Sequence, residues 1–423
     1  MKKKILVKGP VLSQSGYGEQ ARFALRALKT REDIFDIYIE PLNWGKTGWI
    51  SLDNEERAWI DDKVRKANHM KNNKGSYDIS LQITIPNEFK KLAPVNIGYT
   101  AGIETTKVSP VWLQKVNEMD KIVVVSNHSK DVFQDTIYQF EHPQTGQLLQ
   151  LSCQVPVEVV NYPVLSVEAE KLNLELDYDF NYLAISQWGP RKNFNNLINW
   201  FIEENKDKEV GLVLKTSIKN NSKKDRYFTE DKLKQIVSQH GEDIKCKIYL
   251  LHGDLTPEEL SGLYNHKKIK CLISTAHGEG YGLPLFEAAY NGLPVIVHGW
   301  SGQKDFLYMP DSRRSGKTKP MFATVEYELG QVGKEAVWKG VIEKDSQWAY
   351  PKEESFKKRL NEVREKHKSW KTKANKLKKY LVENFTEENM YNKFCENVTD
   401  LIEENFLTEE SIDDLFAKLE KES

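Results

Sequence analysis

The sequence predicts an α/β fold of two similar domains, each built on a parallel sheet. Short apolar runs of the kind buried inside parallel sheets alternate with amphipathic segments along most of the chain. The alternation occurs in two series, separated by the proline-punctuated segment Val155–Pro163. With 423 residues the chain is long for one hydrophobic core and sufficient for two domains. Two such sheets are expected to face each other across a central cleft.

The first series defines an N-terminal domain, which we place at residues 1–165. The segment Glu19–Leu28 has apolar residues at helical spacing. The basic start of the chain precedes too short an apolar run for a signal peptide, so we expect an opening strand there. The predicted strands are Ile5–Val7, Ile37–Ile39, Ile79–Ile83, Val95–Tyr99 and Ile122–Val125.

The second series defines a domain at residues 166–385, and the tail at 386–423 is predicted to be helical. The tail is rich in lysine and glutamate, and Thr386 is a plausible N-cap because two glutamates follow it in the first turn. The predicted strands of the second domain are Tyr182–Ser186, Val210–Leu214, Ile248–Leu251, Cys271–Ser274 and Val295–Val297.

Composition excludes several classes of protein. Hydrophobic residues make up 39% and charged residues 29% of the chain, which is typical of a folded, soluble protein. No run of about 18 apolar residues is present, so no membrane-spanning helix is expected. The four cysteines are scattered and no histidine pair has metal-ligand spacing, so we expect neither disulfides nor a metal site. A reducing cytoplasm is the simplest location.

The clearest chemical signal is a pair of acids, Glu279 and Glu287, around a glycine-rich loop. A strand is predicted to end before the loop and a helix to carry Glu287. Gly280 and Gly282 allow the backbone to approach a ligand closely, and amides at the start of the helix can hold phosphate. Both carboxylates could face a cleft and accept hydrogen bonds from sugar hydroxyls. On its own, such a pair is more often a turn with two solvated acids.

The stretch Glu279-Gly-Tyr-Gly-Leu-Pro-Leu-Phe-Glu287 closely resembles the E-x7-E motif of the retaining glycosyltransferases of family 4. These have the GT-B fold, in which two Rossmann-like domains with parallel sheets face a central cleft and a C-terminal helix crosses back to the first domain. The resemblance covers nearly the whole chain, including Ile248–Tyr264, Trp188–Ile198 and Phe385–Asn389. It implies transfer of a hexosyl or pentosyl group from a nucleotide-diphosphate sugar, without a metal or other cofactor.

The resemblance also implies roles for the residues of the motif. Glu279 would contact the donor sugar and act in catalysis, and Glu287 would contact the ribose of the nucleotide. Backbone amides around Gly282 and Leu283 would hold the diphosphate. Gly280 and Tyr281 complete the predicted donor site within this loop.

Arg191 and Lys192 are predicted to hold the diphosphate. They follow a predicted strand at a loop facing the cleft, where cations can neutralise a departing diphosphate. The alternative is a solvated pair of cations. Many relatives carry another arginine where this chain has Ser186 or Gln187, so Lys192 carries more of that task, with help from Lys215 at the end of the next strand.

The segment Gly16-x-Gly18-x-x-Ala21 matches a dinucleotide-binding fingerprint, but about seven residues separate it from its strand, whereas the dinucleotide turn follows its strand directly. It resembles instead the first-domain loop of GT-B enzymes, so Gly16, Tyr17 and Gly18 are predicted to bind the donor. An NAD-dependent oxidoreductase and a nucleotide-binding protein without activity are the least favoured alternatives.

Glu104 is a further catalytic candidate with two open interpretations. It follows a predicted strand at the edge where ligands bind in open α/β folds. It could therefore contact donor or acceptor, or it could cap a helix near Ser109. His252 and His277 are also near the predicted cleft by position, where a structural role is the commoner one.

The acceptor is not defined by these motifs. The commonest role in the family is polysaccharide or glycolipid synthesis. The segments Gly98–Phe133 and Gln347–Pro351 resemble glycosyltransferases encoded by tailed bacterial viruses, some of which modify hydroxylated pyrimidines in DNA. DNA is therefore a candidate partner. The cations of Arg313–Lys319 and the seven lysines of Lys366–Lys379 could contact its phosphates, although charge runs on helices are usually solvated faces.

Overall fold

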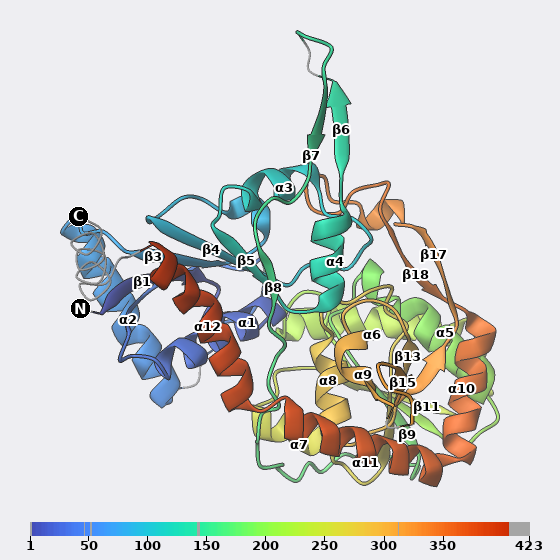
Figure 1. The fold of residues 1–423 in the computed structure, drawn as a ribbon. Helices are drawn as coiled ribbons and strands as arrows, with labels where there is room; N and C mark the ends of the chain where they lie inside the picture. Colours follow the sequence, from blue (N-terminus) through green and yellow to red (C-terminus); the bar gives the residue numbers. More distant parts are fainter. Residues whose placement is uncertain (1, 46, 51–52, 142–143, 312, 406–423) are drawn as a thin grey trace, which may run out of the picture.

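The computed structural model describes residues 2–45, 47–50, 53–141, 144–311 and 313–405 (Figure 1). Its main elements are two six-stranded sheets in which every pair of neighbouring strands is parallel. This confirms the predicted α/β class. Within the described residues, no helix is both long and apolar enough to cross a membrane.

The first sheet has the strand order β2-β1-β3-β4-β5-β8. The predicted run Ile79–Ile83 coincides with β3, and all its residues are buried, because helices cover both faces of the sheet. The strands are β1 (Lys3–Gly9), β2 (Phe35–Pro41), β3 (Ile79–Ile83), β4 (Val95–Thr100), β5 (Lys121–Val124) and β8 (Val157–Val159). The helices are α1 (Gly16–Lys29), α2 (Glu55–Asn72), η1 (Pro86–Glu88), α3 (Pro110–Val116) and α4 (Asn127–Asp135).

The second sheet has the strand order β11-β10-β9-β12-β13-β16, which is the order of a doubly wound nucleotide-binding sheet. Its strands are β9 (Asn181–Ile185), β10 (Gly211–Lys215), β11 (Lys247–Leu251), β12 (Ile269–Ile273), β13 (Val295–His298) and β16 (Ala323–Val325). Its helices are η2 (Pro190–Lys192), α5 (Phe194–Asn205), α6 (Lys223–Ser238), α7 (Pro257–Tyr264), α8 (Leu283–Tyr290) and α9 (Lys304–Leu307).

Three helices end the described chain: α10 (Glu353–Glu365), α11 (His367–Asn384) and α12 (Glu387–Asn405). Thr386 caps α12 as predicted, since its Oγ1 accepts a hydrogen bond from the Asn389 amide at 3.1 Å. α12 crosses to the first domain and packs on α1 (Figure 1). In that contact the ring of Phe394 meets Phe23 at 5.5 Å. Residues 406–423, which belong to the predicted helical tail, lie outside the described residues.

In the part of the chain that the structure describes, three antiparallel strand pairs extend from the two domains. They are β6–β7 (Tyr138–Glu141 and Leu148–Leu151), β14–β15 (Tyr308–Pro310 and Thr318–Pro320) and β17–β18 (Tyr327–Gln331 and Gln347–Pro351), the last with η3 (Lys334–Ala336) between its strands. The β17–β18 hairpin and its connecting segment reach the first domain. The Gln347 amide donates to Thr106 Oγ1 at 3.0 Å, and Ser109 Oγ donates to the Gly340 carbonyl at 2.9 Å.

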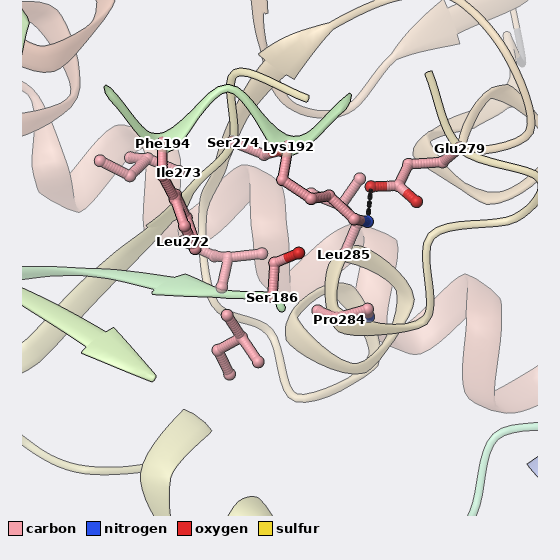
Figure 2. Close-up of a pocket in the computed structure, with 10 residues that line it drawn as sticks. Ser186, Lys192, Phe194, Leu272, Ile273, Ser274, Glu279, Pro284 and Leu285 are labelled. Atoms are coloured by element: carbon pink, nitrogen blue, oxygen red, sulfur yellow. Dashed lines mark hydrogen bonds and ion pairs between the residues drawn. The ribbon is translucent and has the colours of Figure 1, made fainter. Parts of the chain in front are cut away.

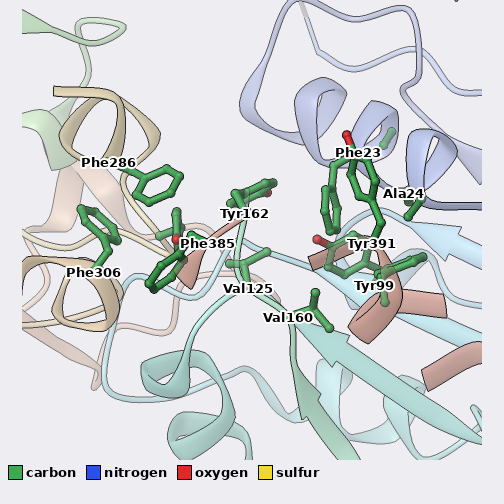
Figure 3. Packing of buried hydrophobic residues seen from close by; sticks show 14 of the residues in the cluster. Phe23, Ala24, Tyr99, Val125, Val160, Tyr162, Phe286, Phe306, Phe385 and Tyr391 are labelled. Atoms are coloured by element: carbon green, nitrogen blue, oxygen red, sulfur yellow. The ribbon is translucent and has the colours of Figure 1, made fainter. Parts of the chain in front are cut away.

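A single hydrophobic core cluster contains residues of both domains. Figure 3 shows Tyr162 between Phe23 of α1 and Phe286 of α8. Its ring lies 5.8 Å from Phe23 and 5.0 Å from Tyr281, which in turn packs on Phe286. Because these rings are buried, separating the domains fully would expose apolar surface at a cost of roughly 25 cal/mol per Å².

Replacing Phe286 with alanine is expected to lower the free energy of unfolding by about 3–5 kcal/mol, because it empties a buried site in this shared core. Val382→Ala, on the exposed side of α11, should change it by less than about 0.5 kcal/mol. Equilibrium urea denaturation followed by tryptophan fluorescence measures both. The shared core also predicts one transition, and independent unfolding of the two domains would contradict it.

Candidate active site

The strand order of the second sheet reverses between β9 and β12, which leaves a crevice at the carboxyl ends of these two strands. The loop after β9 carries Arg191 and Lys192, and the loop after β12 carries Glu279. In the first sheet the corresponding edge bears the loops after β1 and β4. The candidate site lies where these loops meet.

The turn that carries Arg191 and Lys192 is fixed at both ends. Before it, the buried ring of Trp188 packs edge-on against Phe194 at 5.6 Å. After it, Asn193 adopts the left-handed conformation with φ 55°, and its carbonyl accepts a hydrogen bond from Thr275 Oγ1 at 3.1 Å. Asparagine tolerates this conformation better than most residues, so the chain can make a tight turn before α5.

The loop that carries Glu279 is held by its own backbone. The Glu279 amide donates to Ser301 Oγ at 3.0 Å, and the Glu279 carbonyl accepts from the Gly302 amide at 2.9 Å. Gly282 then opens α8 with φ 97°, a conformation that favours glycine. The loop therefore directs the Glu279 side chain and the first amides of α8 toward the crevice.

The same loop is pressed against the first domain at Gly280. A Cβ atom at this position would lie 1.8 Å from the Ala101 carbonyl oxygen, so only glycine fits. Ser126 Oγ, at the N-cap of α4, donates to the Gly280 carbonyl at 2.6 Å. These contacts bring the loop after β4, with Glu104, against the donor-side loops.

Four charged side chains meet at this contact. Arg191 bridges the domains: its guanidinium lies 2.8 Å from Glu104 of the first domain and 2.9 Å from Glu279 of the second. Lys192 pairs with the other oxygen of Glu279 at 2.5 Å. Only 12% of the Glu279 side chain is exposed, so the cluster is largely shielded from water and its attractions are stronger than at a surface.

Burial and neighbouring charge shift the pKa values of the cluster in different directions. Burial disfavours the Glu279 carboxylate, but Lys192 and Arg191 outweigh that cost and lower the pKa of Glu279 to about 2. Burial, reinforced by Arg191, lowers the pKa of Lys192. Burial raises the pKa of Glu104 despite the attraction of Arg191. Glu279 therefore stays charged at all physiological pH values.

A small cavity borders the pair formed by Lys192 and Glu279. Figure 2 shows both side chains above Ser186, Pro284 and Leu285, which line its wall. Its volume is about 20 Å³, enough for about one water molecule and far too small for a sugar nucleotide. A larger ligand would require the ion pairs to rearrange or the domains to separate.

The second motif acid, Glu287, has a different environment. It lies in α8 and its Oε2 accepts a hydrogen bond from Tyr264 of α7 at 2.7 Å. Burial raises the pKa of Glu287 to about 7, because the Tyr264 hydrogen bond only partly offsets the loss of water. The two motif acids therefore differ in charge below neutral pH.

The glycine loop of the first domain begins helix α1 rather than a dinucleotide turn. β1 ends at Gly9 and α1 begins at Gly16, with Ser15 as its N-cap. The Tyr17 hydroxyl lies 2.8 Å from Thr100 Oγ1 and accepts hydrogen bonds from the Ala101 and Gly102 amides. Tyr17 thus sits against the loop that bears Glu104, whereas Gly18 lies against the Ser13 carbonyl and Gly16 has open space beside it.

Some predicted residues lie apart from the ion cluster. Lys215 ends β10 and its Nζ donates to the Gly253 carbonyl at 2.5 Å. The ring of Tyr281 packs in the core shared by the domains, which leaves only its backbone to face a ligand. Leu283 is the first residue of α8 and contributes backbone amide rather than side chain.

The contacts of Glu104 exclude its role as a helix cap, whereas its contact with donor or acceptor stays a prediction. Ser109 caps α3 through the Trp112 amide, so Glu104 does not cap that helix. His252 is buried and pairs with Asp225 at 3.0 Å. His277 stacks on Trp348 at 4.6 Å, and its Nδ1 lies 2.7 Å from the Ala349 carbonyl. Both histidines are structural.

Several residues that define the site were not predicted from the sequence. Tyr264 holds Glu287, and Asp305 accepts hydrogen bonds from Asn127 and Asn161 across the domain contact. Trp44 packs on Tyr17 with ring centroids 4.3 Å apart. A tryptophan in the loop after the second predicted strand was the signal that could have pointed to this last contact.

Comparison with known proteins establishes the fold. No protein-family profile and no curated protein matches the chain in sequence. Sucrose-phosphate synthase from Thermosynechococcus elongatus superposes with a TM-score of 0.60 at 11% identity, over 96% of this chain and 100% of that one. HepE from Anabaena, in complex with UDP-glucose, gives 0.57 at 13% identity, over 94% and 100%. A glycosyltransferase from Rickettsia africae gives 0.57 at 14% identity, over 95% and 99%. The fold of this chain is therefore that of the GT-B glycosyltransferases.

Proposed function

We propose that the chain is a retaining glycosyltransferase that moves a sugar from a nucleotide-diphosphate donor to an acceptor hydroxyl. The observation that carries the proposal is the meeting of Arg191, Lys192 and Glu279 at the point where the strand order reverses, opposite Glu104. Two cations and the start of α8 suit a diphosphate, and a carboxylate beside them suits sugar hydroxyls. The presence of UDP-glucose in the complex of the similar HepE supports a nucleotide-sugar donor.

Donor binding would exchange the partners of the ion cluster. In the structure the negative charges of Glu104 and Glu279 balance the positive charges of Arg191 and Lys192. A diphosphate that attracted both cations would therefore leave Glu279 without its ion-pair partners. Glu279 would then accept hydrogen bonds from the donor sugar, and these would take over from Lys192 and Arg191 in stabilising its buried carboxylate. Glu104 would lose its cation partner, and its raised pKa allows it to become neutral at modest cost.

In the proposed reaction the acceptor oxygen forms a bond to the anomeric carbon as the bond from that carbon to the diphosphate oxygen breaks. Attack on the face that the diphosphate leaves gives retention, and an oxygen of the departing diphosphate takes the acceptor proton. Arg191, Lys192 and the α8 amides would stabilise the charge that develops on the leaving group. These groups would do so without a metal ion, and a cytoplasmic nucleotide-sugar pool would supply the hexosyl or pentosyl donor.

Lys192→Ala is expected to lower kcat for transfer and for donor hydrolysis by about 10²–10³, because it removes one preorganised charge from the leaving group. Lys219→Ala, an exposed lysine after β10, is the matched control and should leave both rates unchanged. Release of nucleoside diphosphate from a panel of nucleotide sugars measures the effect. Equal rates for the Lys192→Ala variant and the wild type would refute the assignment.

Donor affinity is expected to rise with pH through about 7, since Glu287 would accept ribose hydrogen bonds as a carboxylate and its pKa is about 7. The stability of the protein should change in the opposite sense, because a buried carboxyl with a raised pKa favours the folded state less once it ionises. Calorimetric titration of UDP-glucose between about pH 6 and pH 8 tests this, since its diphosphate does not titrate there. Glu287→Gln should abolish the pH dependence, and an unchanged slope would contradict the role.

DNA is a second candidate acceptor, favoured by one specific observation. Burial lowers the pKa of Lys373, and Arg359 and Lys319 lower it further while Glu362 opposes them, so cations of α10, α11 and β15 lie near one another. Two of them have acidic neighbours: Arg359 pairs with Glu362, and Lys319 lies 3.6 Å from Asp311. Arg313, 84% exposed, lies in the adjoining loop. This surface is far from the cleft, however. Lys371, two positions before Lys373 in α11, donates a hydrogen bond to the carbonyl of Gly292. Gly292 follows the C-terminal end of α8, whereas Gly282 at the cleft precedes its N-terminal end.

Transfer of radiolabelled sugar to duplexes with and without hydroxymethylated pyrimidines tests this candidate. Incorporation that depends on the hydroxymethyl group and falls when Arg313 and Lys319 are replaced by alanine would support it. Absence of incorporation into every hydroxylated duplex, with donor hydrolysis intact, would rule it out. A saccharide acceptor predicts that the same double replacement leaves transfer unchanged.

A further inference from the structure

The loop after β2 places two tryptophans at the cleft edge of the first domain. Residues 42–45 leave the carboxyl end of β2, and residues 47–50 run beside the loop after β1. Trp49 forms an isolated β-bridge with Ser13, and the Gln14 amide donates to the Gly48 carbonyl at 2.9 Å. Hydrogen bonds to the loop after β1 therefore fix the position of the segment that carries these two tryptophans, Trp44 and Trp49.

Trp44 is connected to the ion cluster through one side chain. Its ring packs on Tyr17 at 4.3 Å, and the Tyr17 hydroxyl accepts from the amides of Ala101 and Gly102. The Ala101 carbonyl is the group that approaches Gly280, next to Glu279. Trp44 therefore lies in the first domain, and the Tyr17 side chain connects it to the segment at Ala101 that contacts the loop of Glu279.

Trp49 lies further out and offers an open ring, with 49% of its surface exposed. Hydrogen-bonding groups lie along the loop. Ser13 Oγ lies 2.6 Å from Thr47 Oγ1. The side-chain amide nitrogen of Gln14 donates a hydrogen bond to the Asp254 carboxylate of the second domain at 3.1 Å. An exposed aromatic face on a loop that also carries hydroxyl and amide groups suits a sugar ring, which is apolar on its face and polar at its edge.

We propose that the exposed ring of Trp49, on the loop that Trp44 anchors against Tyr17, forms a stacking platform for a pyranose ring of a saccharide acceptor. The inference rests on the proposed glycosyl transfer, because it takes the donor to occupy the second domain. Charge favours a neutral sugar: Lys8 of this edge pairs with Glu40 at 2.7 Å, and Arg57 pairs with Asp61 at 3.0 Å. A phosphate-rich polymer would have to break these pairs, whereas a neutral hydroxylated ring would not.

The test compares Trp49→Ala, Trp49→Phe and Trp338→Ala with the wild type, using methyl glycosides and disaccharides of common hexoses as acceptors. Trp338, in the segment between β17 and β18, is 60% exposed and serves as the matched control. Trp49→Ala should raise the acceptor KM about tenfold or more while kcat, donor hydrolysis and UDP affinity stay unchanged. Trp49→Phe, which keeps an aromatic face, should recover most of the affinity.

Three results would overturn the proposal. A loss of UDP affinity in Trp49→Ala would assign the ring to the donor base, and an unchanged acceptor KM would leave the platform without a role. Transfer to nucleosides or DNA that depends on Trp49 would replace the saccharide by a nucleobase. If the wild type neither binds UDP nor hydrolyses any donor, the proposed glycosyl transfer itself fails. Quenching of tryptophan fluorescence by the free saccharides, present in wild type and lost in Trp49→Ala, separates these two failures.

Discussion

The arrangement of the cleft depends on the ion cluster in which Arg191 holds Glu104 of one domain and Glu279 of the other. Removing one partner of a buried ion pair is costly, because the remaining charge is left without water or a counterion. The domains are closed in this state by a set of charges that is neutral as a whole. In the proposed function, an anionic donor would have to take Arg191 or Lys192 from a carboxylate. Donor binding and the contact between the domains would then be coupled through the same guanidinium.

Two other contacts support the cluster, and they differ in kind. The first is the aromatic core around Tyr162 and Tyr281, which resists separation of the two domains because separation would expose its apolar surface to water. The second is the β17–β18 hairpin, which holds the first domain by hydrogen bonds such as that from the Gln347 amide to Thr106 Oγ1. Hydrogen bonds to water can replace these at small net cost. Opening would therefore begin on the hairpin side and pivot on the aromatic core. This order exposes the crevice at Glu279 while the shared core stays packed.

Local patterns in the sequence predicted the elements and the donor-side motifs. The buried run Ile79–Ile83 is continuous because both faces of its sheet are covered, and the glycine-rich loop before Glu287 does lie between a strand and a helix. The contact between Glu104 and Arg191 could not be predicted in this way, because it depends on how two domains close. The same holds for Tyr264, which only the packing of α7 against α8 brings to Glu287. Tyr281 shows the converse: the motif resemblance suggested a ligand contact, but an aromatic side chain at that position is drawn into the core between the domains.

The two acids of the motif show how environment gives one residue type two chemical characters. Glu279 lies between cations and keeps its charge, whereas Glu287 lies against Tyr264 in an apolar setting and changes charge near neutral pH. Glu279 can therefore respond to a ligand only by exchanging partners, which links it to the domain contact through Arg191. Glu287 can respond by releasing a proton, with no change in that contact. Sensitivity to domain closure and sensitivity to pH would then reside in separate carboxylates eight positions apart in one motif. Because only the rest of the glycine loop and the first turn of α8 separate them in the chain, a single donor would have to satisfy both at once.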